Sequence, residues 1–217
     1  MLPAFITFEG IDGCGKSTQT RLLASVLRLR GVEVVTTREP GGTPLGQKLR
    51  HALLEAEGQV DPLAELLLYA ADRAQHVRAL VRPALAAGQI VLSDRYADAT
   101  VAYQGAGRGF EPELVAQIVG LATGGLKPDL TLLFDLPVAA ARERASSRTR
   151  NGRVHDRLDG EDPAFHTRVR EAYLQIAREE PARVRVVDAS ASVEETHAQV
   201  LTVVLPLLEK RGLGARG

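Results

Sequence analysis

The feature that most limits what this chain can fold into is the glycine-rich run at residues 10–18. It reads G-I-D-G-C-G-K-S-T and contains the pattern G-x-x-x-x-G-K-S, which binds the phosphates of nucleoside triphosphates. Its glycines allow positive φ and a close approach of the backbone to a ligand. Successive N–H groups can then bind phosphate oxygens at the start of the next helix. The residues expected to contact the phosphates are Gly10, Asp12, Gly13, Cys14, Gly15, Lys16, Ser17 and Thr18.

The segments on either side of this loop support the motif. Residues 4–8 are apolar and predict a buried strand, and residues 18–30 predict a helix, as the motif requires. Lys16 would supply a cation for the β- and γ-phosphates, and Ser17 a hydroxyl for Mg²⁺. The dinucleotide pattern G-x-G-x-x-G fails, because Thr18 stands where its last glycine would be. The sequence therefore predicts a protein that binds a nucleoside triphosphate.

Composition is that of an ordinary globular protein. The 217 residues are 45% hydrophobic and 25% charged, which predicts one α/β domain spanning residues 1–217. Acidic and basic residues balance at 27 each, which argues against a protein that coats nucleic acid or a membrane surface. The single cysteine excludes an internal disulfide. With neither a signal-peptide pattern nor a membrane-length apolar run, we expect a cytoplasmic protein.

Predicted strands and helices alternate along the chain. The strands lack clean alternation of apolar and polar residues, as expected of parallel strands that are covered on both faces. The fold expected is a doubly wound parallel sheet that binds ligands at the carboxyl ends of its strands. Strands are predicted at 4–8, 32–37, 89–93, 130–134 and 184–187, and helices at 18–30, 45–56, 62–87, 112–123, 138–148, 164–179 and 193–211.

Polar residues follow the second and third predicted strands. The second is followed by the run R-E-P-G-G-T at residues 38–43, and the third by Asp94 and Arg95. Asp94 has the position of a carboxylate that holds magnesium. Arg95 offers a planar fork to an anion. The alternative is an ion pair between these two neighbours that only caps the strand.

Four further side chains are candidates by position. Tyr69 and Arg73 lie four residues apart on one helix face, where a ring and a guanidinium could bind a planar base. A buried tyrosine beside a surface ion pair fits that spacing equally well. Glu9 and Asp12 flank Gly10, and carboxylates this near to phosphates would repel them. We therefore expect both to face magnesium-bound water or a sugar hydroxyl.

A concentration of arginine lies late in the chain. Six of the 23 arginines fall between residues 142 and 157, and residues 146–153 are polar and contain a glycine. Such a segment should be mobile, and an arginine-rich lid over phosphates would exclude water and stabilise charge. The alternatives are a solvated basic face and an RNA-binding surface, although no aromatic residue is interleaved.

Together these segments resemble the thymidylate kinase family. The resemblance runs from about residue 4 to about residue 200, and its most specific parts are R-E-P-G-G-T at 38–43, D-R-Y at 94–96 and Y-Q-G at 103–105. It implies a P-loop fold with a five-stranded parallel sheet flanked by helices, of the nucleoside-monophosphate-kinase type. It also implies transfer of the γ-phosphate of ATP to dTMP, giving dTDP for dTTP synthesis, with Mg²⁺ and a homodimer.

The resemblance assigns roles to individual residues. Lys16 and Ser17 would act on the ATP phosphates and Mg²⁺, with Asp94 near the metal. Lys16, Arg95, Arg148 and Arg153 would be catalytic, the last two as alternatives within the lid, while Arg144 would stack on adenine. The dTMP site would comprise Arg38 and Arg95 at the phosphate, Asp12 at the 3′-hydroxyl, Tyr69 and Arg73 at the base with Thr100 and Gln104, and Tyr103 at the 2′ position.

Three other functions remain as alternatives. One is another nucleoside-monophosphate or deoxynucleoside kinase with the same architecture. A GTPase switch would need an N-K-x-D motif after a strand, whereas the nearest stretch, residues 127–129, precedes one. An RNA-binding protein would use the arginine run, but the zero net charge argues against it.

Overall fold

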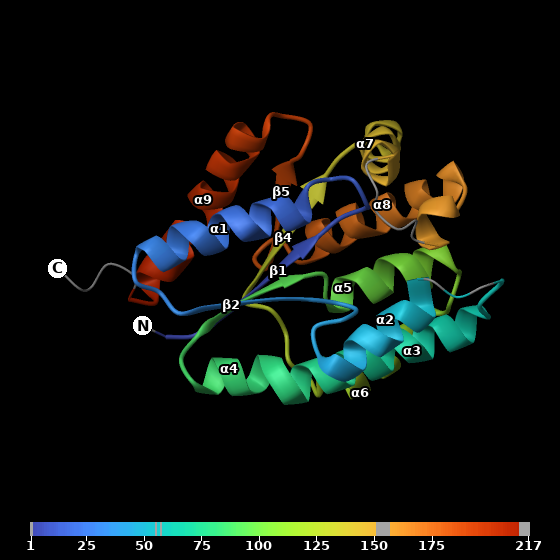
Figure 1. Cartoon of the computed structure of the whole chain (residues 1–217), viewed down its shortest axis with the longest axis horizontal. Helices are drawn as coiled ribbons and strands as arrows, with labels where there is room; N and C mark the ends of the chain where they lie inside the picture. Colours follow the sequence, from blue (N-terminus) through green and yellow to red (C-terminus); the bar gives the residue numbers. More distant parts are fainter. Residues whose placement is uncertain (1, 55, 57, 151–156, 213–217) are drawn as a thin grey trace.

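The computed structural model describes residues 2–54, 56, 58–150 and 157–212. Its centre is a five-stranded sheet in the order β2-β3-β1-β4-β5 (Figure 1), and every neighbouring pair is parallel. All five predicted strands are confirmed, with ends that move by at most two residues. The strands are β1 (Ala4–Glu9), β2 (Val34–Arg38), β3 (Ile90–Asp94), β4 (Leu130–Asp135) and β5 (Val184–Asp188).

Helices fill the predicted ranges, with three differences. The expected single helix at 62–87 consists of α3, a wider π-helical turn and α4. A helical stretch at 97–107 and a short 3₁₀ helix at 157–160 were not predicted. The helical elements are α1 (Lys16–Leu29), α2 (Pro44–Leu54), α3 (Pro62–His76), η1 (Val77–Val81), α4 (Arg82–Ala86), α5 (Ala97–Thr100), η2 (Val101–Gly107), α6 (Pro112–Thr123), α7 (Val138–Arg150), η3 (Arg157–Gly160), α8 (Pro163–Glu179) and α9 (Val193–Lys210).

Tertiary packing explains why the stretch at 97–107 escaped prediction. Local propensity is poor there, because Gly105 and Gly107 disfavour a helix. However, η2 lies against α8, and a Cβ at Gly107 would come within 2.7 Å of the Phe165 ring. The close contact needs glycine, and burial against α8 supplies the stabilisation that the local sequence lacks.

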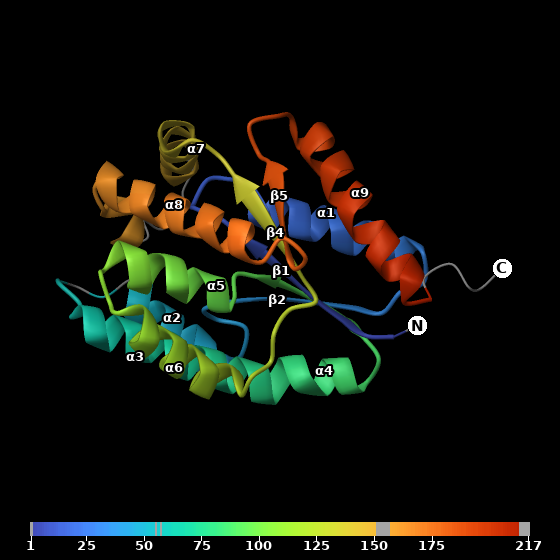
Figure 2. The same cartoon turned by 180° about the vertical axis from the view of Figure 1, so that it is seen from behind.

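Helices cover both faces of the sheet (Figures 1 and 2). On one face α1 and α9 pack together, and Leu23 and Leu27 of α1 join Ile6 of β1 in the core. On the other face, Phe5 of β1 packs with Val81 of η1. Because neighbouring residues of a strand point to opposite faces, both faces of β1 must be apolar. This is why the strand shows no alternation of apolar and polar residues.

The register brings three strand ends to one edge of the sheet. Phe8 of β1 and Arg38 of β2 both lie beside Asp94, the last residue of β3. The phosphate loop, the segment after Arg38 and the segment after Asp94 therefore begin side by side. The fold places the sequence motifs together at the edge where parallel sheets bind ligands.

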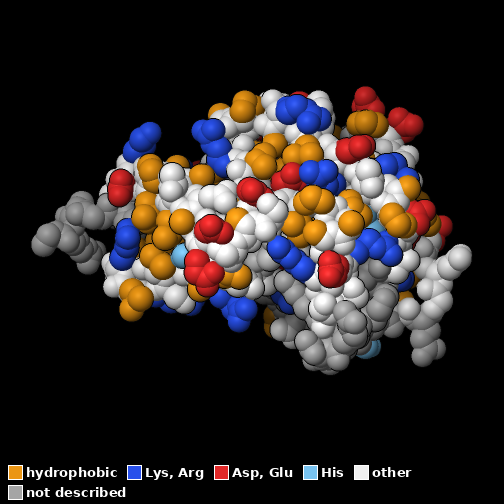
Figure 3. Space-filling model, turned by 90° about the horizontal axis from the view of Figure 1, so that it is seen from above, with side chains coloured by type: hydrophobic (Ala, Val, Ile, Leu, Met, Phe, Trp, Pro, Cys, Tyr) orange, Lys and Arg blue, Asp and Glu red, His pale blue; other side chains and the backbone are white. Residues whose placement is uncertain are grey.

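The surface carries both signs of charge. On the face seen in Figure 3, acidic and basic side chains are interspersed among apolar ones, in line with the equal totals of the sequence. Within the described residues, no helix is both long enough and apolar enough to cross a membrane.

The arginine-rich segment is only partly described. Its first part, residues 142–150, continues α7 as a helix that extends two residues beyond the predicted end. Residues 151–156 lie outside the described residues, and the segment is described again from Arg157 at the start of η3.

Candidate active site

The phosphate loop has the conformation that its glycines predict. Gly10, Gly13 and Gly15 have φ values of 134°, 89° and 98°. A Cβ at Gly13 would lie 2.2 Å from the carbonyl oxygen of Ala141, so only glycine fits there. Gly15 is the N-cap of α1 and has no side chain to occupy the helix N-terminus. The loop therefore leaves a positive helix end open to an anion.

Lys16 lies across this loop. Its ammonium Nζ donates to the carbonyl oxygens of Gly10, at 2.8 Å, and Ile11, at 2.9 Å. The side chain is buried but lines a pocket at the sheet edge. The cation is thus held above the loop and faces the space that phosphates would occupy.

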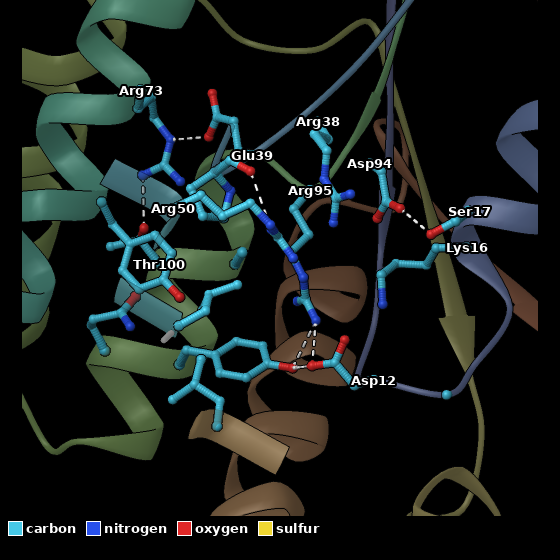
Figure 4. Close-up of a pocket in the computed structure, with 18 of the residues that line it drawn as sticks. Asp12, Lys16, Ser17, Arg38, Glu39, Arg50, Arg73, Asp94, Arg95 and Thr100 are labelled. Carbon is cyan, nitrogen blue, oxygen red and sulfur yellow. Dashed lines mark hydrogen bonds and ion pairs between the residues drawn. The ribbon is translucent and has the colours of Figure 1, made fainter. Parts of the chain in front are cut away.

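Ser17 and Asp94 come together next to Lys16 (Figure 4). The Ser17 hydroxyl donates to Oδ2 of Asp94, and both residues line the pocket. A hydroxyl oxygen beside a carboxylate oxygen is the type of donor set that Mg²⁺ prefers. The alternative ion pair between Asp94 and Arg95 is wrong, because Arg95 pairs with Asp12.

Arg95 is held in an unusual backbone conformation. Its φ of 75° is the only positive value for a non-glycine residue within the described ranges. Its N–H donates to Phe8 O at 2.9 Å, and its own carbonyl accepts from Ser93 Oγ at 2.8 Å. Such strain persists only where surrounding contacts enforce it, and it commonly accompanies a functional site.

The Arg95 guanidinium is aimed at the phosphate loop. Nη2 donates to Asp12 Oδ2 at 2.9 Å and to the Tyr103 hydroxyl at 3.0 Å, and the group lies 4.8 Å from the centre of the Tyr103 ring. Nη1 donates to the Tyr173 hydroxyl at 3.3 Å. Burial acts to lower the pKa of Arg95, but Asp12 raises it well above its usual value. The arginine stays charged at the mouth of the loop.

Glu9 differs from the prediction. It is fully buried, and its carboxylate accepts from the Tyr96 N–H and the Tyr173 hydroxyl, each at 2.7 Å. The expectation that it faces magnesium-bound water or a sugar hydroxyl is therefore wrong. Burial, with the charge of Asp98, raises the pKa of Glu9 to about 8. Glu9 supports the turn that carries Arg95 instead of touching a substrate.

Arg73 forms the other end of the pocket. It is buried, so the alternative of a surface ion pair is wrong. Nε donates to Glu39 Oε2 at 2.8 Å, Nη1 to Thr100 Oγ1 at 2.7 Å and Nη2 to the Tyr96 carbonyl at 2.9 Å. His76 holds the second Glu39 oxygen at 2.7 Å. These contacts fix the guanidinium plane and leave two of its five N–H groups for other partners.

One pocket brings together every residue predicted for an acceptor nucleotide. Figure 4 shows Arg73 and Thr100 on one side, Lys16, Ser17 and Asp94 on the other, and arginines between them. The lining includes the full predicted acceptor set, Asp12, Arg38, Tyr69, Arg73, Arg95, Thr100, Tyr103 and Gln104. A pocket that is lined by a few convergent polar and charged groups is the kind of place where a small ligand binds.

Some predicted residues are not at this pocket. Gly10, Cys14 and Thr18 belong to the loop but do not line the cavity. Arg144 donates to the Ala189 carbonyl at 2.9 Å, beside the segment between β5 and α9. Arg153 and the side chain of Arg148 lie outside the described residues.

Comparison with known proteins decides the family. A family model described as thymidylate kinase matches residues 8–200. The chain belongs to the thymidylate kinase family. The thymidylate kinase of Geotalea uraniireducens (strain Rf4) is 49% identical over 207 residues, covering 94% of this chain and 97% of that protein. That of Gloeobacter violaceus is 51% identical over 201 residues, covering 92% and 93%.

A solved thymidylate kinase structure shares the fold. The crystal structure from Ehrlichia chaffeensis matches with a TM-score of 0.76 at 35% identity, covering 94% of this chain and 99% of that chain. The predicted P-loop fold of the nucleoside-monophosphate-kinase type is confirmed by this match and by the parallel sheet.

Sequence reasoning missed several lining residues of this thymidylate kinase family member. Arg50 of α2 donates to the Pro40 carbonyl at 3.2 Å and lines the pocket beside Arg38. It lies within the helix that directly follows R-E-P-G-G-T, and no local sequence pattern distinguishes it from other arginines. Glu39 was within the quoted motif but had no role assigned. The remaining missed residues are Pro40, Leu54, Ala99 and Leu158.

Proposed function

We propose that this chain transfers the γ-phosphoryl group of ATP to dTMP, forming dTDP and ADP on the route to dTTP. Family membership supports the reaction. The structural observation that carries it is that the phosphate loop and the acceptor residues line one pocket. Lys16 lies at one end and Arg73 at the other, so a donor phosphate and an acceptor nucleotide could meet in line. Holding two reactants in this way supplies a large part of the rate of phosphoryl transfer.

Three arginines of the pocket suit the acceptor phosphate. Arg38, Arg50 and Arg95 lie between the base end and the phosphate loop. A guanidinium can bind two phosphate oxygens at once, which fixes position as well as charge. Asp12 holds Arg95 in place at 2.9 Å. We assign Arg95 to the catalytic group with Lys16, because it would fix the attacking oxygen.

The base and sugar would occupy the remaining space. Tyr69 offers a ring for stacking, and Arg73 offers N–H groups to a carbonyl of the base. Thr100 and Gln104 line the same end of the pocket. Tyr103, close to Asp12, would crowd a 2′-hydroxyl and favour deoxyribose, while Asp12 would accept from the 3′-hydroxyl.

We assign the Mg²⁺ of this reaction to Ser17 and Asp94. Their hydroxyl and carboxylate oxygens lie in hydrogen-bonding contact next to the phosphate loop. Mg²⁺ is generally held by only one or two protein oxygens together with substrate phosphates. When bound, Mg²⁺ neutralises phosphate charge.

The arginine-rich segment would complete the site as a lid within a single kinase domain. We propose that the segment at 142–157 closes over the phosphates and brings in Arg148 or Arg153 to stabilise the transferred group. Arg144 would stack on adenine. What supports this assignment is its hydrogen bond to Ala189, which follows β5 at the carboxyl edge of the sheet.

We propose in addition that the protein is a homodimer and works in the cytoplasm. Apolar side chains are exposed on two adjacent helices, Leu63 and Leu67 on α3 and Leu114 and Leu121 on α6. Such a patch is typical of an interface. The cytoplasm suits a chain with a single cysteine, which is buried.

The test of the reaction is ADP release with ATP, Mg²⁺ and a panel of acceptors: dTMP, dUMP, UMP, CMP, GMP and thymidine. Preference for dTMP is the expected result. Turnover of a different monophosphate would overturn the acceptor assignment, and no transfer at all would overturn the kinase. For the lid, combined Arg148→Ala, Arg150→Ala and Arg153→Ala should lower the rate by about 10³ or more. Near-full activity of that triple variant would exclude the lid role.

A further inference from the structure

A fully buried carboxylate lies behind the base end of the pocket. Glu65 of α3 has no exposed surface and does not line the cavity. Its Oε1 accepts from Gln104 Nε2 at 2.9 Å and from Arg108 Nε at 3.2 Å. Its Oε2 accepts from Arg108 Nη2 at 3.0 Å and from Arg157 Nη2. These partners come from three other parts of the chain: Gln104 from η2, Arg108 from the turn after it and Arg157 from the start of η3.

Two arginines keep this carboxylate ionised. Burial acts to raise the pKa of Glu65, but the hydrogen bonds from Arg108 and Arg157 bring it below its usual value. An ionised carboxylate can only accept hydrogen bonds. The Gln104 atom that faces Glu65 must therefore be the amide nitrogen. The orientation of the Gln104 amide follows from the charge of Glu65.

The other end of the Gln104 amide faces the pocket. Gln104 is 2% exposed and lines the cavity. With Nε2 committed to Glu65, Oε1 is the atom left to meet a ligand. Among the described residues, no donor forms a hydrogen bond with Oε1. The pocket thus presents an acceptor at Gln104 and donors at Arg73.

This arrangement matches one class of pyrimidine. Thymine and uracil carry a carbonyl oxygen next to a ring N–H, so the oxygen can accept from Arg73 and the N–H can donate to Gln104. Cytosine has the reverse pattern, an amino group next to a ring nitrogen that accepts. The amino group of cytosine would face the donors of Arg73, and its ring nitrogen would face the acceptor oxygen of Gln104. Neither pair can form a hydrogen bond, so buried polar groups would be left unpaired.

We propose that Glu65 is a positioning residue for base selection: it fixes the Gln104 amide so that the site accepts a pyrimidine with an N3–H and rejects cytosine. The proposal rests on the proposed dTMP kinase activity. Glu65 acts only through Gln104 and does not touch the base. Because dUMP also carries the N–H, this contact separates dTMP from dCMP and not from dUMP.

The substitution Glu65→Gln gives a directional test. Arg108 and Arg157 can only donate, so they would take the single amide oxygen of the new side chain. Its NH₂ would then face Gln104, whose amide would have to turn over and present its own NH₂ to the base. We expect kcat/KM for dTMP to fall, that for dCMP to rise, and the ratio between them to drop by about tenfold or more. The KM for ATP should not change.

A matched control and a double variant separate positioning from general damage. Glu161 also pairs with Arg108, at 2.7 Å, but does not contact Gln104. Glu161→Gln should leave the dTMP/dCMP ratio unchanged. In a Gln104→Ala background, adding Glu65→Gln should not alter the ratio further, because the residue it acts through is gone.

The outcomes are distinct. An unchanged ratio in Glu65→Gln, or an equal effect of Glu65→Gln with and without Gln104, would overturn the proposal. If Glu65→Gln does not fold, Glu65→Asp carries the test. It keeps the negative charge near both arginines but draws the carboxylate back by one methylene, which weakens its hydrogen bond to Gln104, and the ratio should fall. Absence of dTMP phosphorylation by the unsubstituted protein would instead overturn the proposed function.

Discussion

Single residues of this site are tuned by what surrounds them, and Glu9 is the clearest case. Its pKa is raised from 4.5 to about 8 by burial. The folded protein therefore holds a proton that the unfolded chain releases near pH 4.5. Between these values the folded state binds more protons than the unfolded state, so the free energy of unfolding falls as pH rises. Above about pH 8 the carboxylate is ionised in both states, and the free energy of unfolding no longer changes with the titration of Glu9.

Glu9→Gln should remove this pH dependence. A glutamine can accept from the Tyr96 N–H with its oxygen and donate to the Tyr173 hydroxyl with its amide, as a protonated Glu9 would. In the unsubstituted protein, Glu9 lowers the free energy of unfolding by roughly 1.4 kcal/mol per pH unit between its two pKa values, 4.5 and about 8. Urea unfolding of both proteins from pH 5 to pH 8 measures the difference. Parallel curves would show that Glu9 is ionised throughout.

Lys16 should be needed for turnover and not for folding. Its ammonium is held by two loop carbonyls above the space for phosphates, and alanine is a good helix former at this first position of α1. Lys16→Ala should lower kcat by at least about a hundredfold. ADP release measures turnover, and thermal unfolding measures the fold. A variant with a normal melting temperature and normal kcat would contradict the assignment.

For single residues, the sequence was most informative where a motif determines the local geometry. The spacing of the phosphate loop fixes Lys16 and Ser17, and strand register then brings Asp94 to them. Glu9 was misjudged because proximity along the chain does not say which way a side chain points at the end of a strand. Arg50 was missed because its place depends on how α2 folds back over the Pro40 segment.

Among the elements, the close approach of α2 to α3 shapes the acceptor side of the pocket. The segment between β2 and α2 is tied to α3, because the Gly41 N–H donates to Asp72 Oδ1 at 3.1 Å. Gly46 of α2 faces the same carboxylate, and a Cβ there would lie 2.4 Å from Asp72 Oδ1. The lack of a side chain at Gly46 lets the two helices hold the segment that carries Arg38 and Glu39.

Gly46→Ala should therefore destabilise the protein and weaken acceptor binding. The added methyl group must displace Asp72 or α2, at a cost of roughly 1–3 kcal/mol. Gly120 of α6 is the control, because a Cβ there meets nothing within 4 Å. Gly120→Ala should be neutral or stabilise by up to about 1 kcal/mol. Urea denaturation and KM for dTMP measure both effects, and equal stabilities of the two variants would refute the packing argument.

Helices and strands were predicted well where the hydrophobic pattern agrees with the proline and glycine residues that mark helix ends. All five strands and the helices outside 97–107 and 157–160 could be placed from apolar runs, Pro62, Pro112 and the glycines after helices. The stretch at 97–107 could not, because its helical form depends on contact with α8, 60 residues further along the chain. It also carries Thr100, Tyr103 and Gln104, which line the pocket and are proposed to contact the nucleotide. The part of the proposed site that local sequence specifies least is therefore this stretch.

For the whole molecule, the question is how the outer surface of α3 and α6 is used. These helices lie side by side (Figure 2), and α3 carries Tyr69 and Arg73, which line the pocket. Leu63 and Leu67 are one turn apart on α3, and Leu114 and Leu121 are two turns apart on α6. Each pair therefore lies on one face of its helix. A second copy of the chain seated there would bury these side chains and brace the helix that carries Tyr69 and Arg73.

Leu121→Asp should therefore convert the proposed dimer into a monomer. Leu121 is 79% exposed, so the substitution leaves the core intact, while a buried carboxylate in the middle of an apolar interface is strongly unfavourable. Leu29 of α1 is 88% exposed and lies on a different part of the molecule, which makes Leu29→Asp the matched control. Sedimentation velocity should give a dimer for the unsubstituted protein and for Leu29→Asp, and a monomer for Leu121→Asp.

If Leu121→Asp sediments as a dimer, the interface is elsewhere. If the unsubstituted protein is already monomeric, the dimer itself is excluded. Because α3 carries Tyr69 and Arg73 of the proposed base site, the monomeric variant should also show a higher KM for dTMP with its KM for ATP unchanged.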